Sequence, residues 1–220
     1  MHRIASLMMV ACLVAACDSG PAGPAAGILG VNFVGMTVAD LDQSTGFYAA
    51  AVKLQTMEDA TAEALAPIAQ LAQGGEMRAR LLRSSNAQLR LMQFGGPSAT
   101  GAVPVNGPGI AHVCYQVNKT TGAYQTFLDS GARALGSVAM VQLSERNPVE
   151  YAYALDSDGI MFEVEHVDVS QLDLEQPPAN DYRIRHVSLA SPDIDSLVAF
   201  YGVLLGDQDA RRIGRWFKLS

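Results

Sequence analysis

The sequence predicts an α+β fold made of repeated units in which a strand runs into a helix. The first observation is a repeated start: Phe33-Val-Gly-Met-Thr-Val-Ala-Asp40 leads into Phe47-Tyr48, and His186-Val-Ser-Leu-Ala-Ser-Pro-Asp193 leads into Phe200-Tyr201 with the same offset. The second is a looser copy of this start at His112. The third is that runs of β-branched and aromatic residues at period two follow the starts, a pattern typical of strands. Together these observations predict one structural unit that recurs along the chain.

Each start is expected to form a strand followed by an amphipathic helix. Asp40 and Asp193 stand where a side-chain oxygen accepts hydrogen bonds from the first free N–H groups of a helix, and Thr120 or Thr121 can do so in the middle copy. Gly131 stands where a left-handed C-terminal cap is expected. A helix with one apolar face needs a sheet to cover it, so further strands should follow each start.

The first module is predicted over residues 30–95. After the first helix we expect a second helical stretch over 61–72. Two strands then follow over 77–82 and 88–94, joined by a turn at Ser84-Ser-Asn86. These elements supply the sheet that the first helix covers.

The second module is predicted over residues 109–168, after a Pro- and Gly-containing linker at 96–108. Its first strand and helix are completed by strands around 139–143, 150–155 and 159–165. The turn Asp156-Ser-Asp-Gly159 joins the last two strands as a hairpin. The order is therefore one strand, one helix and three more strands.

The third module, over residues 182–220, is predicted to be incomplete. It begins at Tyr182 and stops after what resembles the start of a second strand. A strand-helix-strand piece of this length buries too little apolar surface to offset its chain entropy. Two interpretations stay open: it starts a second pair of modules in a longer chain, or it docks on the first two modules.

His112 and Glu163 are the strongest candidates for chemistry in this sequence. Successive side chains on a strand point to opposite faces, so His112, Cys114 and Gln116 share one face of the run from 109 to 117. Glu163 and Glu165 likewise share the face of the last strand that lies opposite its apolar residues. We expect both of these polar faces to be exposed to solvent and to look into the same concavity.

The runs Gly109-Ile-Ala-His-Val113 and Asp156-Ser-Asp-Gly-Ile-Met-Phe-Glu163 resemble a module of the vicinal oxygen chelate superfamily, which contains glyoxalase I, extradiol dioxygenases and bleomycin-resistance proteins. The resemblance implies paired βαβββ modules, with curved mixed sheets that enclose a cleft and helices outside. It also implies that His112 and Glu163 are ligands of a divalent metal such as Fe, Zn, Ni or Mn. No nucleotide cofactor is expected.

The identity of the remaining ligands depends on which modules pair. The resemblance implies that modules one and two pair, but the matching positions of module one hold Phe33 and Arg90, and neither side chain can bind a cation. If modules two and three pair instead, His186 joins His112 and Glu163 in a two-His-one-carboxylate set, which suits Fe(II) with open positions. In another alternative, His186 serves a pair of its own.

Two further residues are candidates for binding a substrate. Arg90 can hold a carboxylate in a bidentate fork. Gln116, on the same face as His112, is a second candidate and also a weak oxygen donor for a metal.

These residues support two main hypotheses of function. The first is a metal-dependent lyase, isomerase or ring-cleaving dioxygenase that acts on a small molecule with two adjacent oxygens, with Glu163 as the candidate catalytic residue. The second is a metal-free protein that binds or sequesters a small molecule, like the bleomycin-resistance branch. A structural lipoprotein with a decayed site is a weaker alternative, and a homodimer is a further expectation.

The N-terminal segment predicts attachment to a membrane by a lipid. Residues 1–17 have a short basic start, an apolar run and the sequence Val14-Ala-Ala-Cys17, which resembles a bacterial lipobox with Cys17 as the lipidation site. An ordinary secretory signal is the alternative. Residues 18–29 are rich in Gly, Pro and Ala and are expected to form a flexible tether. We therefore expect a lipid-anchored protein on the periplasmic side of a bacterial cell envelope.

Composition and charge exclude one class of partner. The chain has 220 residues, a formal net charge of −7 and a pI near 5.0, so it offers no basic surface to neutralise nucleic-acid phosphates. After cleavage and acylation only Cys114 remains as a free thiol, which cannot form an intramolecular disulfide. We expect it to be a small buried side chain.

Overall fold

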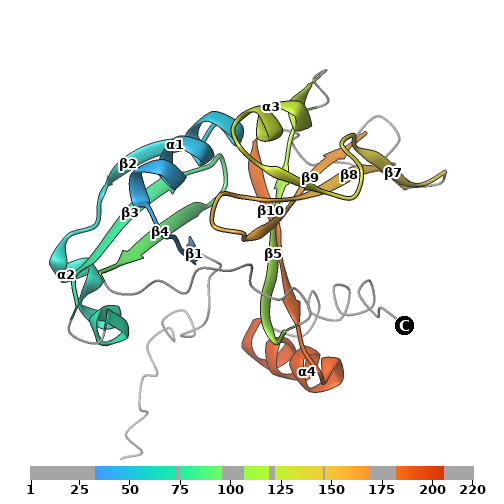
Figure 1. Cartoon of the computed structure of the whole chain (residues 1–220). Coiled ribbons are helices and arrows are strands. Elements are labelled where there is room, and N and C mark those ends of the chain that lie inside the picture. Colours follow the sequence, from blue (N-terminus) through green and yellow to red (C-terminus); the bar gives the residue numbers. More distant parts are fainter. Residues whose placement is uncertain are drawn as a thin grey trace, which may run out of the picture.

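Two mixed sheets make up the protein (Figure 1). The computed structural model describes residues 33–72, 75–95, 107–118, 122–145, 147–168 and 182–205. One sheet has four strands in the order β1-β4-β3-β2; the other has six, with the path β10-β5-β9-β8-β6 and β7 paired to β8. The predicted α+β class is confirmed.

The four-stranded sheet belongs to the first predicted module. Its elements are β1 (Phe33–Thr37), α1 (Leu41–Ala51), β2 (Gln55–Asp59), α2 (Ala62–Leu65), the 3-10 helix η1 (Ala66–Ala72), β3 (Met77–Arg83) and β4 (Gln88–Phe94). Strand β2 was missed by the sequence analysis. All of its residues are exposed, so it carries no alternation of apolar and polar side chains.

The six-stranded sheet contains the second predicted module and β10. Its elements, with the helix that follows, are β5 (Gly109–Gln116), α3 (Ala123–Asp129), β6 (Arg133–Leu135), β7 (Val141–Ser144), β8 (Asn147–Leu155), β9 (Met161–Val167), β10 (Arg183–Ala190) and α4 (Ile194–Leu205). Strand β6 was not predicted, yet it takes the outer position on β8, while the predicted strand at 139–143 corresponds to β7. Strands β5-β9-β8-β6 thus repeat the order β1-β4-β3-β2. The module bounds themselves stay a prediction.

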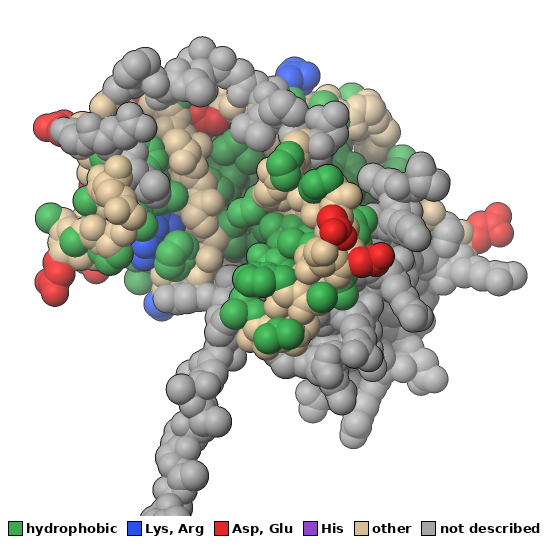
Figure 2. Space-filling view, turned by 90° about the horizontal axis from the view of Figure 1, so that it is seen from below, with side chains coloured by type: hydrophobic (Ala, Val, Ile, Leu, Met, Phe, Trp, Pro, Cys, Tyr) green, Lys and Arg blue, Asp and Glu red, His purple; other side chains and the backbone are tan. Residues whose placement is uncertain are grey.

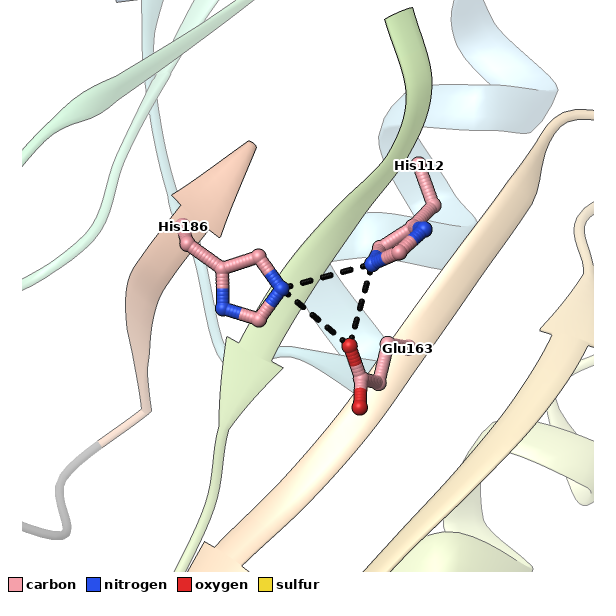
Figure 3. Close-up of side chains that lie close together, drawn as sticks. All are labelled: His112, Glu163 and His186. Carbon is pink, nitrogen blue, oxygen red and sulfur yellow. Dashed lines mark hydrogen bonds and ion pairs between the residues drawn. The ribbon is translucent and has the colours of Figure 1, made fainter. Parts of the chain in front are cut away.

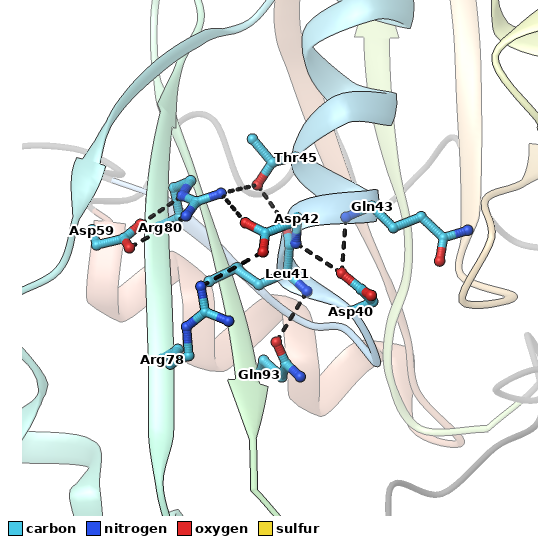
Figure 4. Close-up of polar contacts among 9 residues, drawn as sticks. All are labelled: Asp40, Leu41, Asp42, Gln43, Thr45, Asp59, Arg78, Arg80 and Gln93. Carbon is cyan, nitrogen blue, oxygen red and sulfur yellow. Dashed lines mark hydrogen bonds and ion pairs between the residues drawn. The ribbon is translucent and has the colours of Figure 1, made fainter.

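Polar contacts at the start of α1 hold this helix on its sheet (Figure 4). The Asp40 carboxylate accepts hydrogen bonds from the N–H groups of Asp42 and Gln43, both at 2.9 Å, as the sequence predicted for a cap. Arg80 on β3 reaches Asp42 with its Nη1 atom, 2.7 Å from Oδ1, and also binds Asp59 on β2. The helix is therefore tied both to its own backbone and to two strands.

Two of the other predicted helix caps can be compared with the structure. Asp193 caps α4, accepting from the N–H group of Ser196 at 3.0 Å. Gly131 follows α3 with φ +106°, which is the predicted left-handed conformation. Helix α3 begins after Gly122, and the predicted capping residues Thr120 and Thr121 lie outside the described residues.

Helix α1 joins the two halves of the protein. The rings of Phe47 on α1 and Phe162 on β9 have centroids 5.9 Å apart, and the Tyr48 hydroxyl donates to the Asp156 carboxylate at 2.7 Å. In the predicted turn, Asp158 accepts hydrogen bonds from the Ala39 N–H group at 2.7 Å and from the Ser44 hydroxyl at 2.8 Å. Buried residues from both sheets form one continuous apolar cluster around these contacts.

Strand β5 has β10 as its outer neighbour, and β1 lies in the other sheet (Figure 1). The β10–β5 pair is antiparallel, with His186 opposite Cys114 and Ser188 opposite His112. Of the two pairings left open by the sequence, the described strands follow the one that brings the start of module three beside module two. The pairing of modules one and two that the resemblance implies stays a prediction, and Phe47 on α1 packs against Phe162 on β9 across these two modules.

Helix α4 follows β10 and leaves apolar side chains on the surface. Phe200, Val203 and Leu204 are 60%, 89% and 42% exposed. In the view from below, hydrophobic side chains gather at the end of the molecule where Figure 1 places α4 (Figure 2). The predicted signal segment, the tether and residues 206–220 lie outside the described residues. None of the described helices is long and apolar enough to span a bilayer.

Candidate metal centre

Three donor atoms from three neighbouring strands converge on one point (Figure 3). His112 Nε2 lies 3.0 Å from Glu163 Oε2 and 3.3 Å from His186 Nε2, and His186 Nε2 lies 3.2 Å from the same carboxylate oxygen. His112 comes from β5, Glu163 from β9 and His186 from β10. This metal triad, as we call the three residues, is the set that the pairing of modules two and three predicts.

The spacing of the metal triad fits a divalent ion. Donor atoms held about 2.1 Å from one ion lie about 3.0 Å apart in an octahedral arrangement and about 3.4 Å apart in a tetrahedral one. The three measured separations, 3.0, 3.2 and 3.3 Å, fall between these limits. The donors are two imidazole nitrogens and one carboxylate oxygen, a combination that suits Fe, Mn, Ni or Zn. The residues present therefore fit the ion that the resemblance implies.

The face of the sheet that carries the metal triad is buried, contrary to the expectation of a solvent-exposed face. His112 is 5% exposed and Glu163 is 6% exposed, while Cys114 and Gln116 are fully buried. The polar side chains of this face, which we call the site face, bind one another and the flanking strand β10. The strand pattern predicts which side chains share the face but not whether water reaches it.

Electrostatics keep Glu163 ionised despite its burial. Burial alone would raise the pKa of Glu163, but hydrogen bonds from His112 and His186 outweigh it and lower the pKa to about 2. Each imidazole can present its Nε2 lone pair to an ion only when the ring proton sits on the other nitrogen. The metal triad thus combines one ionised carboxylate with two imidazoles whose ring nitrogens can either donate a hydrogen bond or offer a lone pair.

Tyr153 borders the metal triad on β8. It stands directly opposite Glu163 across the β8–β9 pair, and its ring lies edge-on to that of His112, with centroids 5.4 Å apart. Burial, together with the nearby Glu163 carboxylate, raises the pKa of the Tyr153 hydroxyl. Tyr153 is therefore a protonated hydrogen-bond donor at the edge of the centre.

A β-bulge brings two consecutive residues of β10 onto the site face. Ile184 pairs with Tyr115 and His186 pairs with Cys114, so Arg185 is an extra residue on β10. In a regular strand Arg185 and His186 would point to opposite faces. Here Arg185 forms an ion pair with Glu165 while His186 contacts Glu163.

The turn between β3 and β4 holds the strand at this bulge. The Asn86 side-chain amide donates to the Ile184 carbonyl at 2.7 Å, and its oxygen accepts from the Ile184 N–H group at 3.1 Å. Module one therefore fixes the backbone two residues before His186, although it supplies no donor atom to the metal triad.

A thiol and a second carboxylate lie beside the metal triad. Cys114 Sγ is 3.7 Å from Glu165 Oε2, and both residues are buried on the site face. Burial, followed by the charge of Glu163, raises the pKa of the Cys114 thiol. The expectation of Cys114 as a small buried side chain agrees with its burial, but its neighbours are polar.

The two predicted substrate-binding residues lie in different sheets. Arg90 on β4 places its guanidinium 3.8 Å above the centre of the Phe33 ring on β1, a cation–π contact within module one. Gln116 lies on β5, two residues beyond Cys114. Their binding roles stay predictions, as do those of the metal triad and of Cys17.

Arg185 and Asn86 were not predicted from the sequence, because neither a β-bulge nor a contact between residues distant in sequence leaves a periodic pattern.

Comparisons with known proteins agree with this architecture. Residues 30–164 match the Glyoxalase/Bleomycin resistance protein/Dioxygenase superfamily. A glyoxalase family protein from Bacillus cereus has a similar structure, with a TM-score of 0.55 and 20% identity, covering 66% of this chain and 99% of that one. Glyoxalase I from Zea mays has a TM-score of 0.56 and 15% identity, covering 78% of this chain and 53% of its own. At these identities the likeness shows the fold alone. No curated protein matches the sequence.

Proposed function

Because the chain belongs to the glyoxalase/bleomycin resistance protein/dioxygenase superfamily, we propose that it is a metal-dependent enzyme acting on a small molecule with two adjacent oxygen atoms. The observation that carries this proposal is the convergence of His112, Glu163 and His186, whose donor atoms lie 3.0 to 3.3 Å apart. All three atoms can offer a lone pair to one ion when both imidazoles carry their proton on Nδ1.

The residues of the metal triad would hold the ion, and three protein ligands leave positions open for substrate oxygens. A bound divalent ion supplies Lewis-acid chemistry and, if it is iron, dioxygen chemistry. Glu163 contributes a permanent negative charge, and the two imidazoles complete the donor set. The identity of the ion decides between a lyase or isomerase and a ring-cleaving dioxygenase.

The surrounding residues can orient a substrate. Tyr153 holds its proton and can donate a hydrogen bond to an oxygen beside Glu163. Glu165 faces the same side, and its carboxylate is ion-paired with Arg185. Burial of His112 and Glu163 strengthens these polar contacts, while the His186 side chain is 26% exposed and reaches solvent.

Metal content tests the proposal directly. Loaded with Mn²⁺, the purified chain should retain about one ion per molecule after desalting, and His112→Ala or Glu163→Gln should lower the content at least about 10-fold. His166→Gln is the matched control, because the His166 ring lies 3.1 Å from the Val117 carbonyl and away from the metal triad. Equal and negligible metal in all four proteins would sink the proposal.

A metal-free binding protein is the second candidate, and one observation favours it. The two positions of module one that match the family's ligands hold Phe33 and Arg90, which stack on each other. Thermal unfolding against small aromatic and anionic ligands, with a chelator present, discriminates between the two functions. Stabilisation that survives the chelator and is lost in Arg90→Ala supports the binding protein.

We further propose that the protein is a lipoprotein of a bacterial cell envelope, acylated at Cys17 after removal of residues 1–16. The support is the sequence Val14-Ala-Ala-Cys17 and the Gly- and Pro-rich segment that follows. Membrane fractionation of the full chain and of Cys17→Ala tests it. Equal recovery of the two proteins in the soluble fraction would contradict the anchor.

A further inference from the structure

A second set of donor atoms lies beside the metal triad and shares His186 with it. It consists of Cys114, Glu165 and His186, with one donor atom from each within 4.8 Å of the others. The residues come from β5, β9 and β10, the same three strands that supply the metal triad. Cys114 stands opposite His186 across one strand pair and opposite Glu163 across the other. The thiol therefore lies between the two neighbouring strands that carry the other ligands.

The geometry leaves one oxygen of Glu165 available on the thiol side. Arg185 pairs with Oε1 of Glu165, while Oε2 lies 3.7 Å from Cys114 Sγ. An ion pair at one oxygen fixes the orientation of the carboxylate, as outer partners commonly do for metal ligands. The β-bulge that turns Arg185 toward Glu165 also turns His186 toward the thiol, so one backbone irregularity assembles both features.

The charge of the site face favours a cation at this set. Two carboxylates are buried there, with side chains 8% and 6% exposed for Glu163 and Glu165. Among the described residues, Arg185, 36% exposed, is the arginine that pairs with Glu165. Carboxylates are costly to bury without a compensating cation, so a divalent ion is favoured at this set.

We propose that Cys114, Glu165 and His186 form a thiolate-containing subsite for a thiophilic divalent ion such as Zn²⁺ or Cd²⁺, next to the metal triad. On binding, a metal–sulfur bond forms and the Sγ–H bond breaks; the proton leaves to solvent and nothing is oxidised or reduced. Because His186 belongs to both sets, one ion occupies either the subsite or the metal triad. Soft ions prefer the sulfur donor, while harder ions such as Mn²⁺ prefer the oxygen and nitrogen donors.

The subsite changes how the protein selects its metal. If the metal triad is the working centre, as proposed above, a thiophilic ion in the subsite withdraws His186 from it. Zinc or cadmium would then displace the harder ion while sharing one ligand, His186, with it. The subsite rests on the proposed function only for this consequence, since its own three ligands do not include His112 or Glu163.

Absorption spectroscopy of the full chain tests the subsite. Chelator-stripped protein is titrated with Co²⁺ and Cd²⁺, because thiolate coordination gives an intense near-ultraviolet charge-transfer band that nitrogen and oxygen donors lack. We expect the band to saturate at one ion per chain. Cys114→Ser should abolish it, and Cys17→Ala, the matched thiol control, should retain it. Unchanged circular dichroism of Cys114→Ser shows that the loss is not unfolding.

Two more variants separate the subsite from the metal triad. Glu165→Gln should weaken Cd²⁺ binding at least about 10-fold while the thiol is intact. His112→Ala should keep the charge-transfer band, because the subsite does not use His112. A band that persists in Cys114→Ser, or that disappears in His112→Ala, would overturn the proposal.

Failure of the proposed function has a different signature. In Cys114→Ser only the metal triad remains, so a harder ion such as Mn²⁺ should still bind there. If Cys114→Ser binds no Mn²⁺ while the unmodified chain keeps the charge-transfer band, the result contradicts metal binding by the metal triad and still supports the subsite.

Discussion

Replacing Asn86 by alanine should weaken metal binding, although Asn86 contacts no donor atom. Its side chain makes two hydrogen bonds to the backbone of Ile184, at 2.7 and 3.1 Å, immediately before the bulge that carries Arg185 and His186. A hydrogen bond of this kind contributes about 1 kcal/mol, so the two together stabilise the docking of β10 by about 2 kcal/mol. The Ser84 hydroxyl donates a hydrogen bond to Asn86 Oδ1 at 3.0 Å, which orients the Asn86 amide toward Ile184.

If the loss of these two hydrogen bonds lets β10 detach locally, the affinity for the metal ion should fall. About 2 kcal/mol corresponds to a decrease of about 30-fold in affinity, because His186 must be repositioned before it can bind. The assay is competition for Zn²⁺ against a chromophoric chelator, with the thermal midpoint of the metal-free protein measured in parallel. A lowered midpoint with unchanged affinity would mean that Asn86 supports the fold alone.

Ser85→Ala is the matched control for Asn86→Ala. Ser85 occupies the same turn and is exposed, so its side chain should be dispensable. Equal losses of affinity in Ser85→Ala and Asn86→Ala would refute the reasoning, as would wild-type affinity and stability in Asn86→Ala.

Four further predictions follow from the described contacts. Tyr48→Phe removes the 2.7 Å hydrogen bond to the buried Asp156 carboxylate and should lower the free energy of unfolding by about 1 to 3 kcal/mol in urea denaturation, whereas a change under 0.3 kcal/mol would contradict the contact. Burial raises the pKa of Asp156, so the folded state holds this proton more tightly than the unfolded chain, and its contribution to stability falls as pH rises from about 4 through the raised pKa. Asp156→Asn should remove that part of the pH slope in urea denaturation between pH 4 and 7; an identical slope in both proteins would exclude it. Phe162→Ala empties a fully buried position between α1 and α3 and should cost about 3 to 5 kcal/mol, with Phe162→Leu losing less; equal losses would show that cavity size is not the cause. A chelator should lower the thermal midpoint of the Mn²⁺-loaded chain and leave that of His112→Ala unchanged, since binding at 100 times Kd stabilises by about 2.7 kcal/mol.

The strands that carry an alternating pattern are the ones that the sequence predicts. Strands β3, β4, β5, β8 and β9 combine apolar and polar side chains at period two, and they lie close to the predicted ranges. Strands β2 and β6 were not predicted for a physical reason. Every residue of β2 is exposed, and β6 is only three residues long. Short or fully exposed edge strands owe their conformation to the neighbour they pair with, which a local pattern does not encode.

Which strand lies beside β5 is decided by contacts that are distant in sequence. Strands β1 and β10 begin equivalent repeats, and either could pair with β5 on pattern alone. Helix α1 selects between them, because its Phe47 and Tyr48 side chains enter the core beneath β9 and leave β1 in the other sheet. That arrangement depends on aromatic contacts between segments about a hundred residues apart. The sequence pattern therefore allows both β1 and β10 as the neighbour of β5 and does not decide between them.

The bulge at Arg185 explains why part of the candidate centre can be predicted and part cannot. His112 and Glu163 lie on regular strands, where a period of two assigns them to the same face. On β10 the same rule, applied from the apolar Val187 and Leu189, places His186 on the site face and Arg185 on the opposite one, which agrees with the structure for His186 but not for Arg185. The extra residue places both side chains beside the carboxylates, and Asn86 holds the backbone where the irregularity begins. Because Asn86 holds Ile184, the residue where the register shifts, module one influences a centre whose donors all lie elsewhere.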